Sequence, residues 1–402
     1  MKIKFVLRRN LLHLLQLILW NFIRKIETTL MSKFLGFGSS ILNTLLMFLG
    51  EFLFGLVLYV YQRKYLTVEK EKKKSPLLLT MTVRVKKKNS KIFKQDKLFQ
   101  IYFFFFLCGF FDFVEFTLSL KSLSKFFTVS GSLEWRLAGI LTISSSLCLF
   151  LLMKFDIFKH QKFSLIIIIA TLVIIIVTEF IFQKIDIFLS YSGFFYALFI
   201  IFLIHIFTSL NDIIEKYLFE FNSLNEFKTL MWQGFFGFIL TIFYCIYDSP
   251  FGILVDYYNE HSKTEFVFLI IGLILYVILS GGRNAYRVYV NKLYSPIVKT
   301  LTDYFLNPLY IIYYFCMGED FIINGKSNWA YFLLNLIYSS LITFFGCVYN
   351  EIIVLYFCGL ERDSYDEVCK RATELERLSF QLEEFTASEE SINSLLEEDI
   401  KE

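Results

Sequence analysis

The sequence predicts an all-α polytopic membrane protein, built from helices that cross a bilayer several times. Hydrophobic residues make up 56% of the 402 residues, whereas soluble domains contain about 45–50%. Mean hydropathy is +0.56. Charged residues are few in the long apolar stretches and dense in two short segments. Because about 20 apolar residues cross a bilayer core of ~30 Å, this pattern favours a membrane bundle over a large soluble core.

Ten segments are long and apolar enough to be spanning helices, and the fifth, "FSLIIIIATLVIIIVTEFIF", is the strongest. The first is short and is interrupted by Arg8, Arg9 and His13. It begins like a signal peptide, but no small-residue cleavage site follows, so we expect an uncleaved span. The predicted spans are residues 5–23, 40–61, 99–120, 132–153, 163–183, 193–213, 229–247, 266–282, 294–316 and 329–349.

Basic residues orient these spans. The segment 62–98 carries 13 Lys and Arg residues against three acidic ones. Because short cytoplasmic loops are rich in Lys and Arg, we expect this segment on the cytoplasmic side, together with 154–162, 214–228 and 283–293. Both termini then lie in the cytoplasm. Without the first span, the 62–98 segment would face the opposite side, which favours ten spans.

The tail is different in composition, because it is rich in Glu and poor in aromatic residues after Glu361. A helical stripe through Val368, Leu375 and Leu382 predicts one amphipathic helix, followed by a disordered acidic end. The tail is either simply solvated or paired with the basic 62–98 segment. Anionic lipid headgroups are the other partner expected for that segment. Nucleic acid is not expected, since the segment lacks interleaved aromatic residues.

Ionisable side chains within the spans are the candidate functional residues, since each costs about 2.5–3.5 kcal/mol at the centre of a bilayer. Glu51 is central in the second span, close to Gly50 and Gly55. It is either a cavity carboxylate that binds substrate or a coupling proton, or a protonated group that packs between helices. His205, in the sixth span, is either a proton relay or a packing residue.

Two further pairs lie on single helix faces. Asp112 and Glu115 are three residues apart, so the two carboxylates repel unless one is protonated or matched by a cation. Lys299 and Asp303 are four residues apart and can pair with each other. Pro308 interrupts the same span, which is therefore a candidate for lining a pathway.

Arg136, at the start of the fourth span, can bind an anionic substrate, pair with Asp112 or anchor the helix at the membrane surface. Glu215 and Lys216 are expected at the surface too. The seven cysteines show no metal spacing and are expected to be small core residues. No hydrolase, nucleotide-binding or metalloprotease motif occurs, so we expect no enzyme activity, no cofactor and no metal.

Four stretches occur together in a recognisable order: "LLMFLGEF" at 45–52, "SGSLEWRLAGILTISSSLCLFLLMKF" at 130–155, "NDIIEKYLFEFNSLNEFKTLMWQGFFGFILTI" at 211–242 and "KLYSPIVKTLTDYFLNPLYII" at 292–312. In this order the chain resembles the drug/metabolite transporter superfamily. The resemblance is to its EamA-like, nucleotide-sugar-transporter-like members of the solute carrier 35 F-type branch, and covers about residues 40–350.

The resemblance implies two five-helix repeats of inverted topology, residues 1–183 and 184–350, followed by a cytoplasmic tail, residues 351–402. It also implies transport of a nucleotide sugar or other small metabolite by alternating access, in an endomembrane (Golgi, ER, lysosome or vacuole) rather than the plasma membrane. A homodimer is an open alternative to a monomer, and a non-transporting scaffold is the alternative function. The positions that match the family are Glu51, Arg136, Glu215, Lys216 and Asp303.

Taken together, these observations predict a polar cavity in the bundle. The expected solute-binding residues are Glu51, Asp112, Glu115, Arg136, Lys299 and Asp303, and the proton-coupling candidates are Glu51 and His205.

Overall fold

The computed structural model of the chain describes 2–5, 11–37, 39–65, 98–119, 133–153, 157–182, 191–247, 251–317, 322–323, 326–364, 367, 370, 371 and 374. Most of the basic segment, 66–97, lies outside these residues, as does the tail from 375. The predicted partnership of loop and tail therefore falls outside the described structure, as does most of the predicted tail helix.

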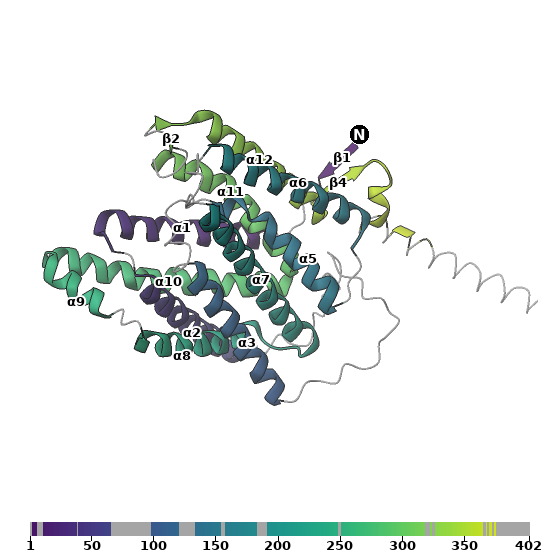
Figure 1. The fold of residues 1–402 in the computed structure, drawn as a ribbon. Coiled ribbons are helices and arrows are strands. Elements are labelled where there is room, and N and C mark those ends of the chain that lie inside the picture. The colour runs from purple at the N-terminus through teal and green to yellow at the C-terminus, as the bar shows by residue number, and fades with distance from the viewer. Residues whose placement is uncertain are drawn as a thin grey trace, which may run out of the picture.

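Helices dominate the described residues (Figure 1). The helices are α1 (Leu11–Leu35), α2 (Ser40–Tyr65), α3 (Leu98–Thr117), α4 (Leu133–Arg136), α5 (Gly139–Met153), α6 (Lys159–Phe182), α7 (Tyr191–Phe221), α8 (Glu226–Tyr247), α9 (Phe251–Glu260), α10 (Lys263–Leu293), α11 (Pro296–Met317) and α12 (Trp329–Tyr349). A 3₁₀ helix, η5 (Leu360–Asp363), follows.

Seven of the described helices are long and apolar enough to cross a membrane: α2, α3, α6, α7, α8, α10 and α12. Many large apolar side chains on these helices are exposed, such as Ile166, Ile181, Phe199 and Phe243. Lipid rather than water suits such a surface. The protein is therefore an all-α polytopic membrane protein, as its composition predicts.

The first predicted span has different bounds in the structure. Instead of ending at residue 23, α1 continues to Leu35 and includes Arg24 and Lys25. Both cations lie over aromatic rings, at 5.8 Å from the ring centroid of Phe116 and 5.4 Å from that of Tyr314. Aromatic faces attract cations, so these charges are accommodated without ending the helix.

The predicted span 132–153 is interrupted. The chain turns at Leu137 and Ala138 between α4 and α5, where backbone bonds join Ile140 N to Leu137 O (2.9 Å) and Leu141 N to Ala138 O (3.0 Å). These i to i+3 bonds tighten the backbone relative to an α-helix.

Two predicted cytoplasmic loops differ from the structure. The loop predicted at 214–228 is reduced to 222–225, because α7 continues to Phe221 and α8 begins at Glu226. The loop predicted at 283–293 is wrong, because α10 fills it completely. The physical reason lies in charge pairing: Arg287 on α10 and Glu215 on α7 neutralise each other, so the charges need not reach water. The short helix α9 is not among the predicted elements either. It precedes Ser262, whose side chain and Glu265 form a capping box that starts α10.

Close helix crossings form where glycines face each other. α2 packs against α8 and α10, and α3 packs against α7 and α8. A Cβ added to Gly50 on α2 would lie 3.1 Å from Gly281 N on α10, and one added to Gly109 on α3 would lie 3.0 Å from Gly237 N on α8. Small residues allow such backbone approach in membrane bundles.

Two short strands join the start of the chain to the segment after α12. β1 (Lys2–Phe5) pairs antiparallel with β4 (Ile353–Tyr356), with Lys2 opposite Tyr356 and Phe5 opposite Ile353. The pair lies at one end of the bundle (Figure 1). A smaller pair, β2 (Ile322–Ile323) with β3 (Lys326–Ser327), connects α11 to α12. The two ends of the helical region therefore meet on one face of the protein.

Candidate functional site

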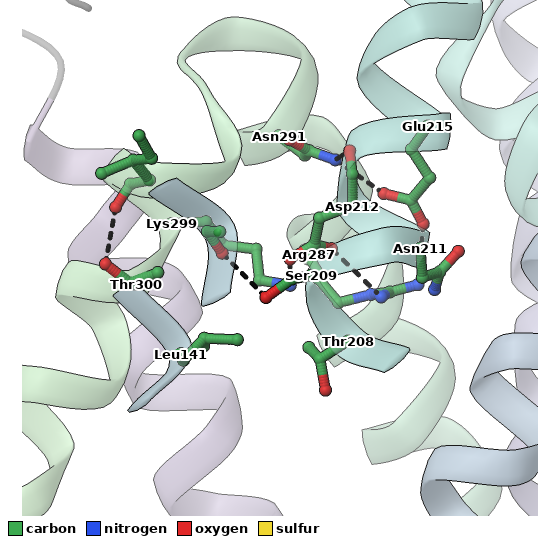
Figure 2. Close-up of polar contacts among 12 residues, drawn as sticks. Leu141, Thr208, Ser209, Asn211, Asp212, Glu215, Arg287, Asn291, Lys299 and Thr300 are labelled. Carbon is green, nitrogen blue, oxygen red and sulfur yellow. Dashed lines mark hydrogen bonds and ion pairs between the residues drawn. The ribbon is translucent and has the colours of Figure 1, made fainter. Parts of the chain in front are cut away.

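Arg287, on α10, is the centre of a buried ionic cluster. Its Nη2 atom lies 2.9 Å from Glu215 Oε1, while Nη1 lies 3.5 Å from Asp212 Oδ1 (Figure 2). The same Nη2 atom lies 3.2 Å from Asp112 Oδ2. None of the four residues is more than 6% exposed. A buried guanidinium requires such partners, because an unpaired charge there is very costly. The cluster thereby ties α10 to α3 and α7.

Amide side chains complete the hydrogen bonding of these carboxylates. Asn211 donates to Asp112 Oδ1 (2.5 Å), and Gln233 on α8 donates to Asp112 Oδ2. Asn291 donates both to Glu215 Oε2 and to the backbone oxygen of residue 212, at 2.9 Å each. The carboxylates that surround Arg287 are thus held by donors from several helices. Of the two alternatives expected for the pair at 112 and 115, protonation or a matching cation, the structure shows the cation for Asp112.

Lys299, on α11, donates to Asp212 Oδ2 and so joins the same cluster (Figure 2). The predicted pairing of Lys299 with Asp303 is therefore wrong. Within the described residues, Asp303 has no hydrogen bond or ion pair. Asp212 is completely buried, whereas Asp303 is only partly buried. An unpaired charge is therefore costlier on Asp212, which favours its pairing with Lys299.

Glu51 belongs to a second chain of hydrogen bonds on α10. It is completely buried, and its Oε1 atom accepts a hydrogen bond from Asn284 on α10. Asn284 Oδ1 in turn accepts from Arg283 Nη1 (2.6 Å), and Arg283 Nε donates to Asn21 Oδ1 on α1 (2.8 Å). Glu51 thus lies at the crossing of α2 and α10, next to Gly50.

A polar cavity of about 80 Å³ lies beside the cluster. Four of the predicted site residues line it: Glu115, His205, Lys299 and Asp303. Three predicted site residues, Glu51, Asp112 and Arg136, do not. The full lining is Leu17, Asn21, Glu115, Ala138, Leu141, Ile204, His205, Thr208, Arg283, Arg287, Lys299, Thr302 and Asp303.

Several polar atoms around this cavity have no hydrogen-bond partner within the described residues. They include Glu115 Oε2, His205 Nε2 and Thr302 Oγ1. Asp303 is also unpaired there, and Arg283 contacts amides rather than a carboxylate. The cavity therefore brings together several polar groups that the described residues leave without a partner.

Negative charge exceeds positive charge in this region. The carboxylates are Glu51, Asp112, Glu115, Asp212, Glu215 and Asp303, whereas the cations are Arg283, Arg287 and Lys299. Arg24 and Glu27 on α1 add one charge of each sign. Because buried carboxylates without counter-charges are unstable, the excess must be neutralised by protons or by a bound cation.

Arg136 lies in a separate cluster formed by α4, α6 and α12. It pairs with Glu179, and its Nη1 atom donates to Tyr331 Oη and Asn335 Oδ1 at 3.0 Å each. Tyr331 also donates to Glu179. The predicted pairing of Arg136 with Asp112 is therefore wrong, and so is the surface anchor, since only 1% of Arg136 is exposed.

Glu215 and Lys216, which are expected at the membrane interface, are both buried inside the protein. Lys216 Nζ donates to the backbone oxygens of Lys292 (3.1 Å) and Tyr294 (2.8 Å), and pairs with Glu220 at 2.8 Å. Cysteines follow the expectation only in part, because Cys316 and Cys358 are exposed. In the part of the chain that the structure describes, no group of three or more His, Cys, Asp or Glu residues could hold a metal ion.

Sequence reasoning misses the residue at the centre. It places Arg283 and Arg287 in a loop, because charged residues normally end a span. A usable signal is present: Gly281, Asn284 and Arg287 repeat at the spacing of Gly109, Asp112 and Glu115, with one small residue and two polar ones on a helix face.

Comparison with known proteins gives a fold but no family. No family model matches the chain. No curated protein matches it either. A solved structure described only as "Crystal structure of protein" aligns with 85% of this chain and 96% of its own, with a TM-score of 0.51 and 10% sequence identity. At that identity the likeness concerns the fold alone.

Proposed function

We propose that this protein is a secondary transporter of a small organic solute, such as a nucleotide sugar or another metabolite, and that it works by alternating access through the cavity beside Arg287. The observation that carries the proposal is the set of unpaired polar groups around that cavity. Glu115 and Asp303 reach it from α3 and α11, and Lys299 and Arg283 reach it as well. Ionisable residues inside a membrane bundle usually mark a substrate or ion pathway.

Ten spans, rather than seven, fit the pairing of β1 with β4. Hydrogen-bonded strands must lie on the same side of the membrane, so the chain between them crosses an even number of times. The seven apolar helices alone give an odd number. Adding α1, α11 and the interrupted α4–α5 helix gives ten crossings. Both termini on one side, proposed here to be the cytoplasm, follow from that number.

Two inverted repeats are supported by which helices are neighbours. Let α1, α2, α3, α4–α5 and α6 form the first repeat, and α7, α8, α10, α11 and α12 the second. The neighbours α1–α10 and α2–α10 then correspond to α7–α3 and α8–α3, and α5–α7 corresponds to α11–α1. α2 and α6 pack against their own counterparts, α8 and α12. Such exchange is what a two-fold relation between repeats requires.

Residues on α10 and α3 follow the same exchange of helix positions between the two proposed repeats. Gly50 and Gly281 make the α2–α10 crossing, and Gly237 and Gly109 make the corresponding α8–α3 crossing. Beyond each crossing, Asn284 bonds to Glu51, and Asp112 bonds to Gln233. Three residues further along, Arg287 and Glu115 occupy equivalent positions, and both line the cavity.

The proposed solute contacts are accordingly Glu115, Lys299 and Asp303, with Asp112 and Glu51 as residues that support them. A volume of about 80 Å³ is well below the roughly 300–1,000 Å³ of common ligand sites. The conformation described is thus proposed to be a closed one, and helix movement must enlarge the cavity for any solute of metabolite size.

Flux measurements test this function directly. The full chain is reconstituted in liposomes, and uptake of a panel of radiolabelled nucleotide sugars, nucleosides and amino acids is compared with that of empty liposomes. A transporter accumulates at least one solute, and Asp303→Asn reduces that uptake. Lys159→Met, an exposed change at the start of α6, is the matched control. No uptake across the panel would argue against the proposal.

A membrane scaffold is the second candidate. It is favoured by the three ion pairs of Arg287 and by the small size of the cavity, which suit a rigid bundle. A scaffold would act through the 62–98 segment and the tail, with anionic lipid headgroups or another protein as partners. Deletion of residues 361–402 separates the two, because a scaffold loses its partners while a transporter keeps its flux.

A further inference from the structure

We propose that Glu115 on α3 and Asp303 on α11 are the groups through which the cavity takes up and releases protons, so that solute movement is coupled to a proton gradient. This inference deepens the proposed function and rests on it for the coupling step. It moves the coupling site away from Glu51. The proton binding itself is a property of the cavity and can be measured with no solute present.

The two carboxylates differ from Asp112, Asp212 and Glu215 by what they touch. Asp112, Asp212 and Glu215 each contact Arg287, and Asp212 contacts Lys299 too. Glu115 Oε2 and Asp303 have no partner among the described residues, although both line the cavity. A proton that binds them therefore does not have to displace an existing ion pair.

Two further side chains point independently to an occupant of this cavity. Thr302 is 2% exposed and His205 is 8% exposed. Their Oγ1 and Nε2 atoms have no partner within the described structure, yet both residues line the cavity. Buried polar groups are nearly always satisfied, if necessary by ordered water. The volume of about 80 Å³ exceeds the roughly 10–15 Å³ that one water molecule needs, so water can enter the cavity and carry protons to the carboxylates.

The charged surroundings favour a proton over a metal ion. The titratable groups that face the pair are Asp112 from α3 itself, His205 and Asp212 from α7, Arg283 and Arg287 from α10, and Lys299, Tyr304 and Tyr310 from α11. α8 contributes the neutral Gln233. Arg283 and Lys299 at the cavity would repel a divalent ion. No metal-binding group of three residues occurs among the described residues.

Glu51 is poorly placed for proton exchange. It is fully buried at the crossing of α2 and α10, bonds to Asn284 and does not line the cavity. A proton on Glu51 would have no route through cavity water. His205 does line the cavity, so it is the competing candidate that the experiment must separate.

Infrared titration tests the assignment on the purified, full-length protein in detergent. The carbonyl stretch of protonated carboxylic acids is followed as the pH is varied, for the wild type, Glu115→Gln, Asp303→Asn and the double variant. We expect each single variant to lose the titrating amplitude of one carboxyl and the double variant that of two, read as the difference from the wild type, because the other Asp and Glu residues of the 37 contribute to both samples. Glu51→Gln and His205→Gln should leave the amplitude unchanged.

An unchanged amplitude in the double variant overturns the proposal, and so does its loss in Glu51→Gln. If the double variant does not fold, the single variants decide, since an unchanged amplitude in both overturns the proposal equally. Reconstituted flux adds a separate result. Flux that ignores an imposed pH gradient overturns coupling while transport stands. Absence of flux for the whole panel counts against transport and leaves the infrared result standing.

Discussion

Lys299 on α11 forms its ion pair with Asp212 on α7, and not with Asp303 one turn further along its own helix. The pair connects two helices that lie at different positions of the proposed repeat. It also decides the character of the cavity, because Asp303 keeps a carboxylate without a cation of its own. A contact across the bundle thus determines which acidic group is held by the protein and which is left for a ligand.

Breaking the pair of Lys299 and Asp212 should lower the free energy of unfolding. Lys299→Met leaves Asp212 facing Arg287 alone, and we expect a loss of about 3–5 kcal/mol in the free energy of unfolding, as for other broken buried pairs. Adding Asp212→Asn to Lys299→Met should recover part of that loss. Denaturant unfolding in mild detergent measures both. Equal losses in the single and double variants would contradict a direct interaction.

Arg287 should not tolerate replacement by lysine. The guanidinium contacts Asp112, Asp212 and Glu215 with two different nitrogens, whereas an ammonium is a single point charge. We expect Arg287→Lys to lower the free energy of unfolding by about 3 kcal/mol, near the lower limit for a broken buried pair. Arg283→Lys is the control on the same helix, because Arg283 binds only amides. A larger loss in the control would refute this ranking.

The crossing of α2 and α10 should be sensitive to one added methyl group. A Cβ on Gly50 would lie 2.5 Å from the backbone oxygen of Val277, which cannot move aside as a side chain could. We expect Gly50→Ala to cost about 1–3 kcal/mol through overpacking. Gly252→Ala, where nothing lies within 4 Å, should be neutral. Thermal unfolding of both variants in one detergent makes the comparison, and matched midpoints would show that the crossing is loose.

Glu51 should behave as a packing residue. Its Oε1 accepts from Asn284, and the amide oxygen of glutamine can accept the same bond. Glu51→Gln is therefore expected to keep both fold and flux, with stability changed by about 1 kcal/mol or less. Glu51→Leu leaves Asn284 without that acceptor and should cost about 1–3 kcal/mol. Unfolding and flux assays on the two variants distinguish this role, and lost flux in a folded Glu51→Gln variant would instead assign Glu51 to the pathway.

The ten-span topology predicts opposite sides for two exposed cysteines. Cys316 lies near the end of α11, and Cys358 follows β4. Because α12 separates them, a membrane-impermeant maleimide should label only one of them in sealed, oriented vesicles. Two variants, each retaining one of these cysteines, provide the measurement, with detergent-opened vesicles as the control for reactivity. Labelling of both from the same side would exclude α12 as a crossing.

The sequence by itself determined the class of protein. Runs of apolar residues such as 163–183 predict membrane helices whatever their neighbours, since backbone groups in lipid must bond within the helix. The same reasoning marked Asp112, Glu115 and Asp303 as costly, and so as candidate site residues. These inferences need only local composition and the spacing of residues on one helix.

Tertiary structure decided which charges are paired and which are not. Basic residues place Arg287 in a loop in the sequence-based prediction, because "GGRNAYRVYVNK" resembles a basic loop. The buried Arg287 is stabilised by its ion pairs with Asp112 on α3 and Glu215 on α7. The sequence also allows Lys299 to pair with Asp303 on its own helix. The structure instead pairs it with Asp212 on α7. Ion pairs in a bundle depend on distances between helices, and those distances are set by crossings such as Gly50 on Gly281, which a one-dimensional pattern does not contain.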